Sequence, residues 1–358
     1  MENILLKLFG DNLLIDIKLN NTINNIINNQ YPSNINIINK YNITTINNNT
    51  HVKNITNNPF IPEIILDYIK NKLKLQYSYI NNELDINFFS KNNIDKILLD
   101  DIHSIIYFIN TIFNNKKKIK INIFLTPFKK EFKKVYDADA INSGSTNRVT
   151  ITLWREEEIR KVLIHELIHY LHIDLKDDSI IASKLLNKIN MCENCQIRPN
   201  EAYTELIAIQ LYILWYNKFK YKNFDYNNFN IMMNNELKWS IYQCAKILNS
   251  FNCFEKFEDI LDKSKNCKIT QYTNMISYFI LKTILLFNIN DFCECIINKV
   301  NNESFNFYDS EQNYNKFYKF IIKCLGNNEF NNIINNIMQN LKNNPELFLP
   351  TMRMSLFG

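Results

Sequence analysis

Residues 162–171 read Val-Leu-Ile-His-Glu-Leu-Ile-His-Tyr-Leu, and this stretch decides the fold that we expect for the chain. Its apolar residues surround two histidines, His165 and His169, and one acid, Glu166. Residues four apart lie one turn apart on the same face of an α-helix, so the two imidazoles can bind one metal ion. The sequence therefore predicts a buried helix that binds one Zn²⁺ ion through His165 and His169, with Glu166 beside the metal.

The alternative interpretation is a core helix whose histidines are only hydrogen-bonded. The chain has five histidines, and three of them lie within residues 165–172. Two histidines and a glutamate on an otherwise apolar helix are costly to bury without partners for their charge. A bound metal ion therefore explains the stretch better than core packing does.

A catalytic zinc site needs a third protein ligand and keeps its fourth position open. Leu175 stands where the metzincin pattern has its third histidine, and the aspartates after the helix lack the context of the deuterolysin-like pattern. The remaining segment is Asn200-Glu201-Ala202-Tyr203-Thr204-Glu205. Its two glutamates, Glu201 and Glu205, are four residues apart and so share one helix face.

This second segment resembles the Asn-Glu-Ala-x-Ser-Asp motif of thermolysin-like gluzincins, which are zinc metallopeptidases. The resemblance covers roughly residues 120–215 and implies a zincin-like core with one Zn²⁺ per chain. It also implies that Glu201 is the third zinc ligand and that Glu205 hydrogen-bonds a ligand histidine. The outer acid is Glu where the family has Asp, and the gap from His169 to Glu201 is longer than in thermolysin. An exchange of roles, with Glu205 on the metal, therefore stays open.

The resemblance implies hydrolysis of a peptide or protein substrate, with Glu166 as general base toward a water activated by the metal. The competing interpretation is a catalytically inactive module of the same fold that binds a peptide or a protein. An intact Glu166 favours the enzyme, because a binding module needs no base beside the metal. The segments 142–146, 155–157 and 161–166 also resemble an uncharacterised zincin-like group of large DNA viruses.

A strand is predicted over residues 148–154, where apolar residues alternate with Thr150, Thr152 and Trp154. In zincins an edge strand just ahead of the metal helix holds the substrate, and the resemblance implies that role for these three residues. A strand without a ligand is the alternative. Gluzincins also use a His or Tyr to stabilise the oxyanion. No histidine follows Glu205, so the candidates are Tyr212, Tyr216, Tyr221, Tyr226 and Tyr242.

Charge and hydropathy indicate an intracellular, cytoplasmic protein. The balance of 41 basic and 36 acidic residues gives a net charge of +5, and lysines gather between residues 116 and 134. We expect these lysines to form a solvated surface rather than a nucleic-acid interface. Residues 1–19 contain three acids, which argues against a signal peptide. No apolar run is long enough to span a membrane.

All eight cysteines lie after residue 190. Disulfide scaffolds are rare in intracellular chains of this length, so we expect unpaired thiols. The alternatives are a structural zinc site that joins Cys192 and Cys195 to Cys293 and Cys295, and a redox switch at Cys192-x-x-Cys195.

The expected fold class is α+β, with a zincin-like core, a small mixed sheet, the metal helix and a mainly helical C-terminal lobe. The expected organisation is an Asn-rich N-terminal region over residues 1–95, a catalytic core over 96–220 and an α-helical lobe over 221–358. The metal helix is predicted over 156–173, and the second ligand helix over 199–219.

Overall fold

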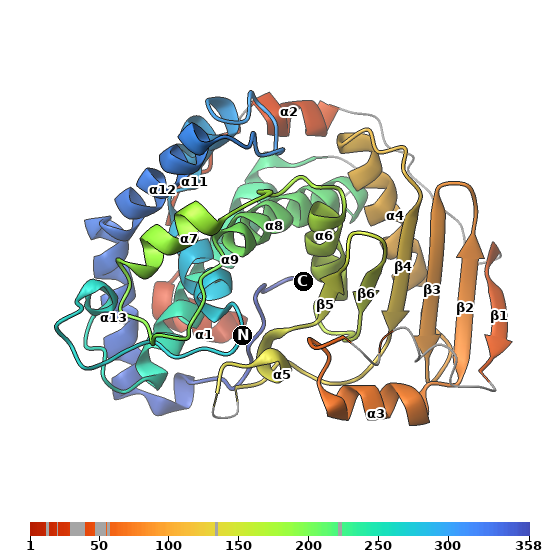
Figure 1. Cartoon of the computed structure of the whole chain (residues 1–358), viewed down its shortest axis with the longest axis horizontal. Coiled ribbons are helices and arrows are strands. Elements are labelled where there is room, and N and C mark those ends of the chain that lie inside the picture. The colour runs from red at the N-terminus through yellow and green to blue at the C-terminus, as the bar shows by residue number, and fades with distance from the viewer. Residues whose placement is uncertain are drawn as a thin grey trace.

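Six strands form one mixed sheet, and helices cover both of its faces in the computed structural model (Figure 1). The α+β class expected from the sequence is confirmed, as is the mainly helical character of the chain after residue 220. The structure describes residues 1–11, 14–19, 21–28, 40–46, 55, 58–132, 135–220 and 224–358.

The sheet has the strand order β1-β2-β3-β4-β6-β5. The strands β3, β4 and β6 run parallel, and the others are antiparallel to their neighbours. Parallel neighbours need a long crossover, which α4 (Lys96–Ile112) supplies between β3 and β4. This sheet therefore spans the expected boundary at residue 95. The strands are β1 (Asn42–Thr45), β2 (Leu75–Ile80), β3 (Leu84–Ser90), β4 (Ile119–Phe124), β5 (Gly144–Thr146) and β6 (Ile151–Leu153).

Both faces of the central strands are buried, as is usual for parallel strands. On one face, Ile65 of α3 (Glu63–Lys72) packs in a cluster with Phe89 of β3 and with Trp154. On the other face, α4 and α6 (Ile159–Tyr170) add apolar side chains to the main core. The main core continues into the helices that follow, so the sheet and the helical part share it.

The predicted metal helix is α6, and it is shorter than the predicted range of 156–173. It begins after Glu158, whose backbone is left-handed (φ 58°), and it ends at Tyr170. The three acids at 156–158 therefore precede the helix. Glu158 instead forms a buried ion pair with Lys130, with 2.7 Å between Oε2 and Nζ. Lys130 is thus not part of the solvated basic surface that we expected, and Lys133 and Lys134 lie outside the described residues.

The predicted second helix is α8 (Pro199–Lys220), which packs against α6. Both α8 and α9 (Tyr226–Ser250) are buried on most sides by the helices around them. Among the described helices, none combines the length and the apolar character that a bilayer span requires. The structure also contains α1 (Glu2–Phe9), α2 (Asn21–Asn28), α5 (Ala138–Ile141), α7 (Ser179–Leu186), α10 (Lys282–Phe287), α11 (Ile289–Phe292), α12 (Glu311–Leu325) and α13 (Asn328–Asn343).

The two ends of the chain pack on the middle of the molecule. Asn234 of α9 accepts hydrogen bonds from the backbone N–H groups of Leu14 and Ile15, at 2.8 and 3.0 Å. The last residues return to the centre beside α6, where Figure 1 marks the C-terminus. Residues 14 and 15 of the expected N-terminal region thus contact the expected C-terminal lobe directly, and the sheet does not lie between them.

Two disulfides overturn the expectation of unpaired thiols for four of the cysteines. Cys192 is bonded to Cys195, and Cys253 to Cys267. The Cα atoms are 5.4 and 5.7 Å apart, within the range that a disulfide bridges. The second pair meets because Asn190 fixes the returning chain, donating hydrogen bonds to three carbonyls between residues 262 and 267. Such long-range closure cannot be read from cysteine spacing.

Candidate metal centre

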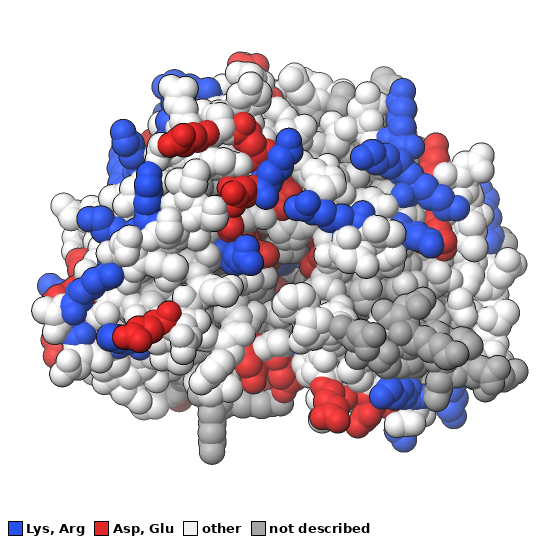
Figure 2. Space-filling model, viewed as in Figure 1, with Lys and Arg blue, Asp and Glu red and all other residues white. Residues whose placement is uncertain are grey.

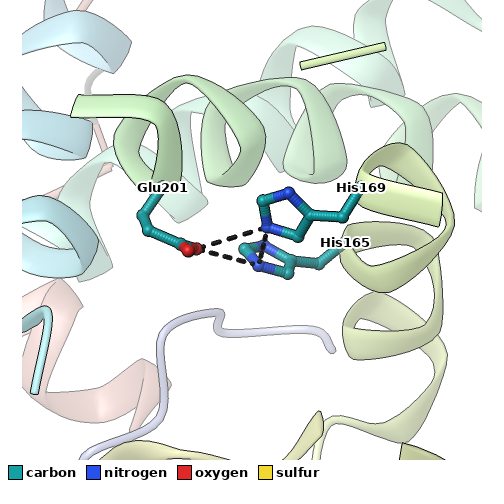
Figure 3. Close-up of side chains that lie close together, drawn as sticks. All are labelled: His165, His169 and Glu201. Atoms are coloured by element: carbon teal, nitrogen blue, oxygen red, sulfur yellow. Dashed lines mark hydrogen bonds and ion pairs between the residues drawn. The ribbon is translucent and has the colours of Figure 1, made fainter. Parts of the chain in front are cut away.

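Three side chains from two helices converge on one point (Figure 3). His165 and His169 project from successive turns of α6, and Glu201 projects from the first turn of α8. The two Nε2 atoms lie 3.1 Å apart, and Glu201 Oε2 lies 3.2 Å from the first and 3.4 Å from the second. The α6 pair follows from its spacing of four residues, whereas Glu201 is brought in by the packing of α8 on α6.

The donor set fits a zinc ion. Zinc binds imidazole nitrogen and carboxylate oxygen at about 2.0–2.1 Å, so two ligand atoms of a tetrahedral site lie roughly 3.3 Å apart. The three observed separations between donor atoms, 3.1, 3.2 and 3.4 Å, lie close to this value. The side chains of His169 and Glu201 remain 15% and 20% exposed, whereas that of His165 is 7% exposed. The cluster is thus open on one side, as a catalytic metal site requires.

A carboxylate behind His169 holds its ring in this orientation. Asp174 Oδ2 lies 2.6 Å from His169 Nδ1 and also accepts a hydrogen bond of 2.8 Å from the Asn200 side chain. The bond at Nδ1 leaves Nε2 directed at the cluster. The sequence showed Asp174 only as one of several acids after the helix. Because α6 ends at Tyr170, the chain turns back and brings Asp174 against the ring.

A second carboxylate lies behind His165. Glu205 Oε1 is 3.0 Å from His165 Nδ1, an ion-pair contact whose angle falls short of a hydrogen bond. Both oxygens of Glu205 accept from the ammonium of Lys161, at 2.7 and 2.6 Å. The structure therefore brings Glu201, rather than Glu205, to the Nε2 atoms. Lys161 was not singled out in the sequence.

The acids of the cluster change the ionisation of both histidines. Burial alone would lower the pKa of His165, but the carboxylates of Glu205 and Glu201 outweigh it and raise that pKa. The pKa of His169 is likewise raised well above its usual value by Glu201 and Asp174, against the effect of burial. This excess of negative charge around two imidazoles is the environment that a divalent cation would neutralise.

Glu166 is buried beside the two histidines, and burial raises the pKa of its carboxyl. Strand β5 passes directly over it at Gly144. A Cβ atom at Gly144 would lie only 2.9 Å from Glu166 Oε1 and 2.9 Å from the side chain of Val162. The absence of a side chain at this position therefore permits the close approach of β5 to α6.

Tyr278 is the residue that the sequence did not reveal. It lies in a π-helical turn, Ile276–Leu281, and donates a hydrogen bond of 3.1 Å to Glu201 Oε2. Burial and then the charge of Glu201 raise the pKa of its phenol well above the usual value. No local pattern distinguishes it from the other tyrosines.

The tyrosines proposed from the sequence lie elsewhere. Tyr212, Tyr226 and Tyr242 donate to backbone carbonyls far from the metal ligands. Tyr216 packs against the ring of Tyr212, and Tyr221 lies outside the described residues.

The predicted edge strand is not at the edge. β6 pairs with β4 on one side and with β5 on the other, so Thr152 lies opposite both Asn122 and Ser145. Trp154 is fully buried in the cluster under α3, and Thr150 lies in the turn before β6. Alternation of apolar residues marks a strand but does not fix its position in the sheet. The edge beside the metal helix is β5.

Among the described strands, β5 is the outermost on this side of the sheet, and alternate residues of β5 direct their backbone groups away from β6. Trp154 N–H donates to Ser143 O, so residues 143 and 154 form a hydrogen-bonded pair of this antiparallel ladder. Hydrogen-bonded pairs alternate with non-hydrogen-bonded ones, so Ser145 and Thr152 form the next such pair. The backbone groups of Gly144 and Thr146 then point outward. Gly144 thus offers its N–H and C=O groups next to Glu166.

A cleft of about 730 Å³ opens beside the cluster. Glu201, Asn200 and Asn142 line it and are half-buried, and Arg148 and Lys176 line it and are exposed. Figure 2 shows Lys and Arg side chains across the middle of this face of the molecule. His172 is exposed after the end of α6 and does not join the metal cluster.

Comparison with known proteins gives one distant relative. No family model and no solved structure matches the chain. Over 175 residues the chain is 33% identical to an uncharacterized protein of Acanthamoeba polyphaga mimivirus. The matched region is 46% of this chain and 44% of that protein, so the similarity covers less than half of each. This relative is viral, which suggests a viral origin for the chain.

Proposed function

We propose that the chain is a zinc-dependent peptidase that binds one Zn²⁺ through His165, His169 and Glu201. The supporting observation is the spacing of the three donor atoms, which matches the separations in a tetrahedral zinc site. The alternative is a zincin-like module that binds a peptide without hydrolysing it. The buried carboxyl of Glu166 favours the enzyme, because burying it costs stability and binding alone does not require it.

The residues around the cluster have distinct roles in this proposal. Bound Zn²⁺ would polarise the scissile carbonyl and lower the pKa of a water beside it. Glu166 would accept a proton from that water and pass it to the leaving amine. The Tyr278 hydroxyl donates to Glu201 Oε2 in this structure and would turn from that oxygen to donate to the oxygen of the scissile carbonyl. The free edge of β5 would pair with the substrate backbone.

Metal content is the first test. The purified chain is expected to hold about one zinc per molecule by elemental analysis, and a His165→Ala/His169→Ala variant none. Glu201→Ala should also lose zinc, whereas Glu205→Gln should retain it with weaker affinity. Zinc retention in Glu201→Ala with loss in Glu205→Gln would exchange the roles of the two acids. Absence of zinc from the unaltered chain, even after zinc is added, would leave a protein with two core histidines.

Hydrolysis is the second test. Glu166→Gln keeps the size of the side chain and removes the base. It should bind zinc as the unaltered chain does and lose about 10²–10⁴-fold in kcat on a peptide substrate. Full activity in this variant would contradict the role of Glu166 as base. A zinc-loaded chain that binds peptides and cleaves none would favour the inactive module.

A further inference from the structure

A small cavity lies between α6 and β5, next to Glu166 and His165. Its volume is about 30 Å³, which is room for one or two water molecules. Gly144 and Val162 form part of its wall, and Met354 from the end of the chain forms another part. The cavity is therefore bounded by a residue that is almost two hundred positions away from the metal helix in the sequence.

The backbone on both sides of Met354 is held in place. Ser355 N–H donates to Glu158 Oε1 at 2.7 Å, and Leu356 N–H donates to Glu236 Oε2 at 3.0 Å. The carbonyl of Met354 itself accepts from the ammonium of Lys282 at 3.1 Å. The three side chains that make these hydrogen bonds, Glu158, Glu236 and Lys282, are all buried. Met354 is thus a fixed wall of the cavity rather than a side chain on a loose end.

We propose that Met354 restricts the substrate to peptides with a small residue on the amine side of the cleaved bond. The inference rests on the proposed peptidase function. Hydrolysis breaks the C–N bond, the carbonyl carbon gains the hydroxyl of water, and the nitrogen gains the proton that Glu166 carries. The residue that owns this nitrogen must therefore lie against Glu166. Its side chain enters the cavity, which has room for that of glycine, alanine or serine.

The test uses the zinc-loaded full chain and a set of peptides that differ only at the residue after the cleaved bond. Cleavage is followed by mass spectrometry, and kcat/KM is compared within the set. Peptides with glycine, alanine or serine should be cleaved at least about tenfold faster than those with leucine or phenylalanine. Met354→Ala should raise kcat/KM for the leucine peptide at least about tenfold, whereas the size-matched Met354→Leu should keep the original preference.

Each outcome bears on the proposal. Equal cleavage before alanine and before leucine by the unaltered chain would overturn it. So would an unchanged preference in a Met354→Ala variant that binds zinc and unfolds at a similar temperature. If that variant does not fold, Met354→Val should still shift the preference toward larger residues, and failure to do so counts against the proposal. Zinc-loaded chain that cleaves no peptide of the set would overturn the peptidase function itself, and this inference with it.

Discussion

Carboxylates lie against the far sides of the two histidines that we propose as metal ligands. His169 has Asp174 at Nδ1, and His165 has Glu205 beside Nδ1. These acids come from different parts of the fold, since Asp174 follows α6 directly and Glu205 lies on α8. Each imidazole is therefore fixed by its own partner, and the two rings can be tested separately.

Removal of the Asp174 carboxylate should weaken metal binding. Asp174→Ala takes away the hydrogen bond that orients His169, and loss of such a partner lowers metal affinity about 10–100-fold. The measurement is competition for zinc with a chromophoric chelator. Asp177→Ala is the matched control, because Asp177 is an exposed acid of the same loop that does not contact the histidine. Equal affinity in the two variants would contradict the orienting role of Asp174.

At the scale of elements, the site depends on how closely β5 approaches α6. Gly144 is the point of contact, because an added Cβ atom there would lie 2.8 Å from Leu153 Cδ2 and 2.9 Å from Glu166 Oε1. Leu153 belongs to the next strand, Glu166 is the proposed base, and Val162 of α6 lies equally close at 2.9 Å. A side chain at this position must therefore move either the strand or Glu166.

Gly144→Ala should lower both stability and hydrolysis. Overpacking of this kind costs about 1–3 kcal/mol of unfolding free energy, and displacement of Glu166 would lower kcat. Gly326→Ala is the control, since the nearest atom to its added Cβ would be 3.7 Å away. Its effect should stay within about 0.5 kcal/mol. Urea denaturation of both variants measures the difference, and equal midpoints would contradict the close packing.

At the scale of the whole molecule, the end of the chain runs back through the helical part to the metal helix. Lysines of the core hold its carbonyls along the way. Lys246 of α9 donates to Leu349 O at 3.0 Å and to Thr351 O at 2.5 Å, and Lys282 donates to Met354 O. These contacts connect Lys246 of α9 and Lys282 of α10 to the segment that ends at the wall of the proposed substrate cavity.

Burial of Lys246 should give the protein a characteristic pH dependence. Burial lowers the pKa of Lys246 to about 7, against about 10.4 in an unfolded chain. Between these values the unfolded state binds more protons than the folded state, so stability rises with pH. The slope from this residue is at most about 1.4 kcal/mol per pH unit, and below pH 7 its contribution levels off.

The measurement is the unfolding free energy from urea titrations at pH 6, 7, 8 and 9. Lys246→Met removes the charge at similar volume. The difference in unfolding free energy, variant minus unaltered chain, should therefore decrease as the pH rises from 7 to 9. Lys282 titrates in both proteins, and its contribution cancels in the difference. Parallel curves for the two proteins would contradict a neutral Lys246 at alkaline pH.

The sequence by itself determined the parts of the site that follow local spacing. His165 and His169 face one point because a helix places residues four apart on one side. Helix α8 has the predicted bounds to within one residue, whereas α6 is shorter than predicted at both ends. The segment that supplied Glu201 was found by resemblance, and the structure brings this residue to the two histidines. Within each helix the decisive interactions lie within a few residues of one another, whereas the meeting of Glu201 with the histidines depends on the packing of α8 on α6.

Only the tertiary structure decided the features that join distant parts of the chain. Tyr278 reaches Glu201, Asp174 reaches His169 because α6 ends early, and β5 rather than β6 lies at the sheet edge. The disulfide between Cys253 and Cys267 and the wall formed by Met354 have the same origin. The physical reason is that packing and strand pairing depend on which surfaces meet, and local periodicity carries no information about the partner of a surface.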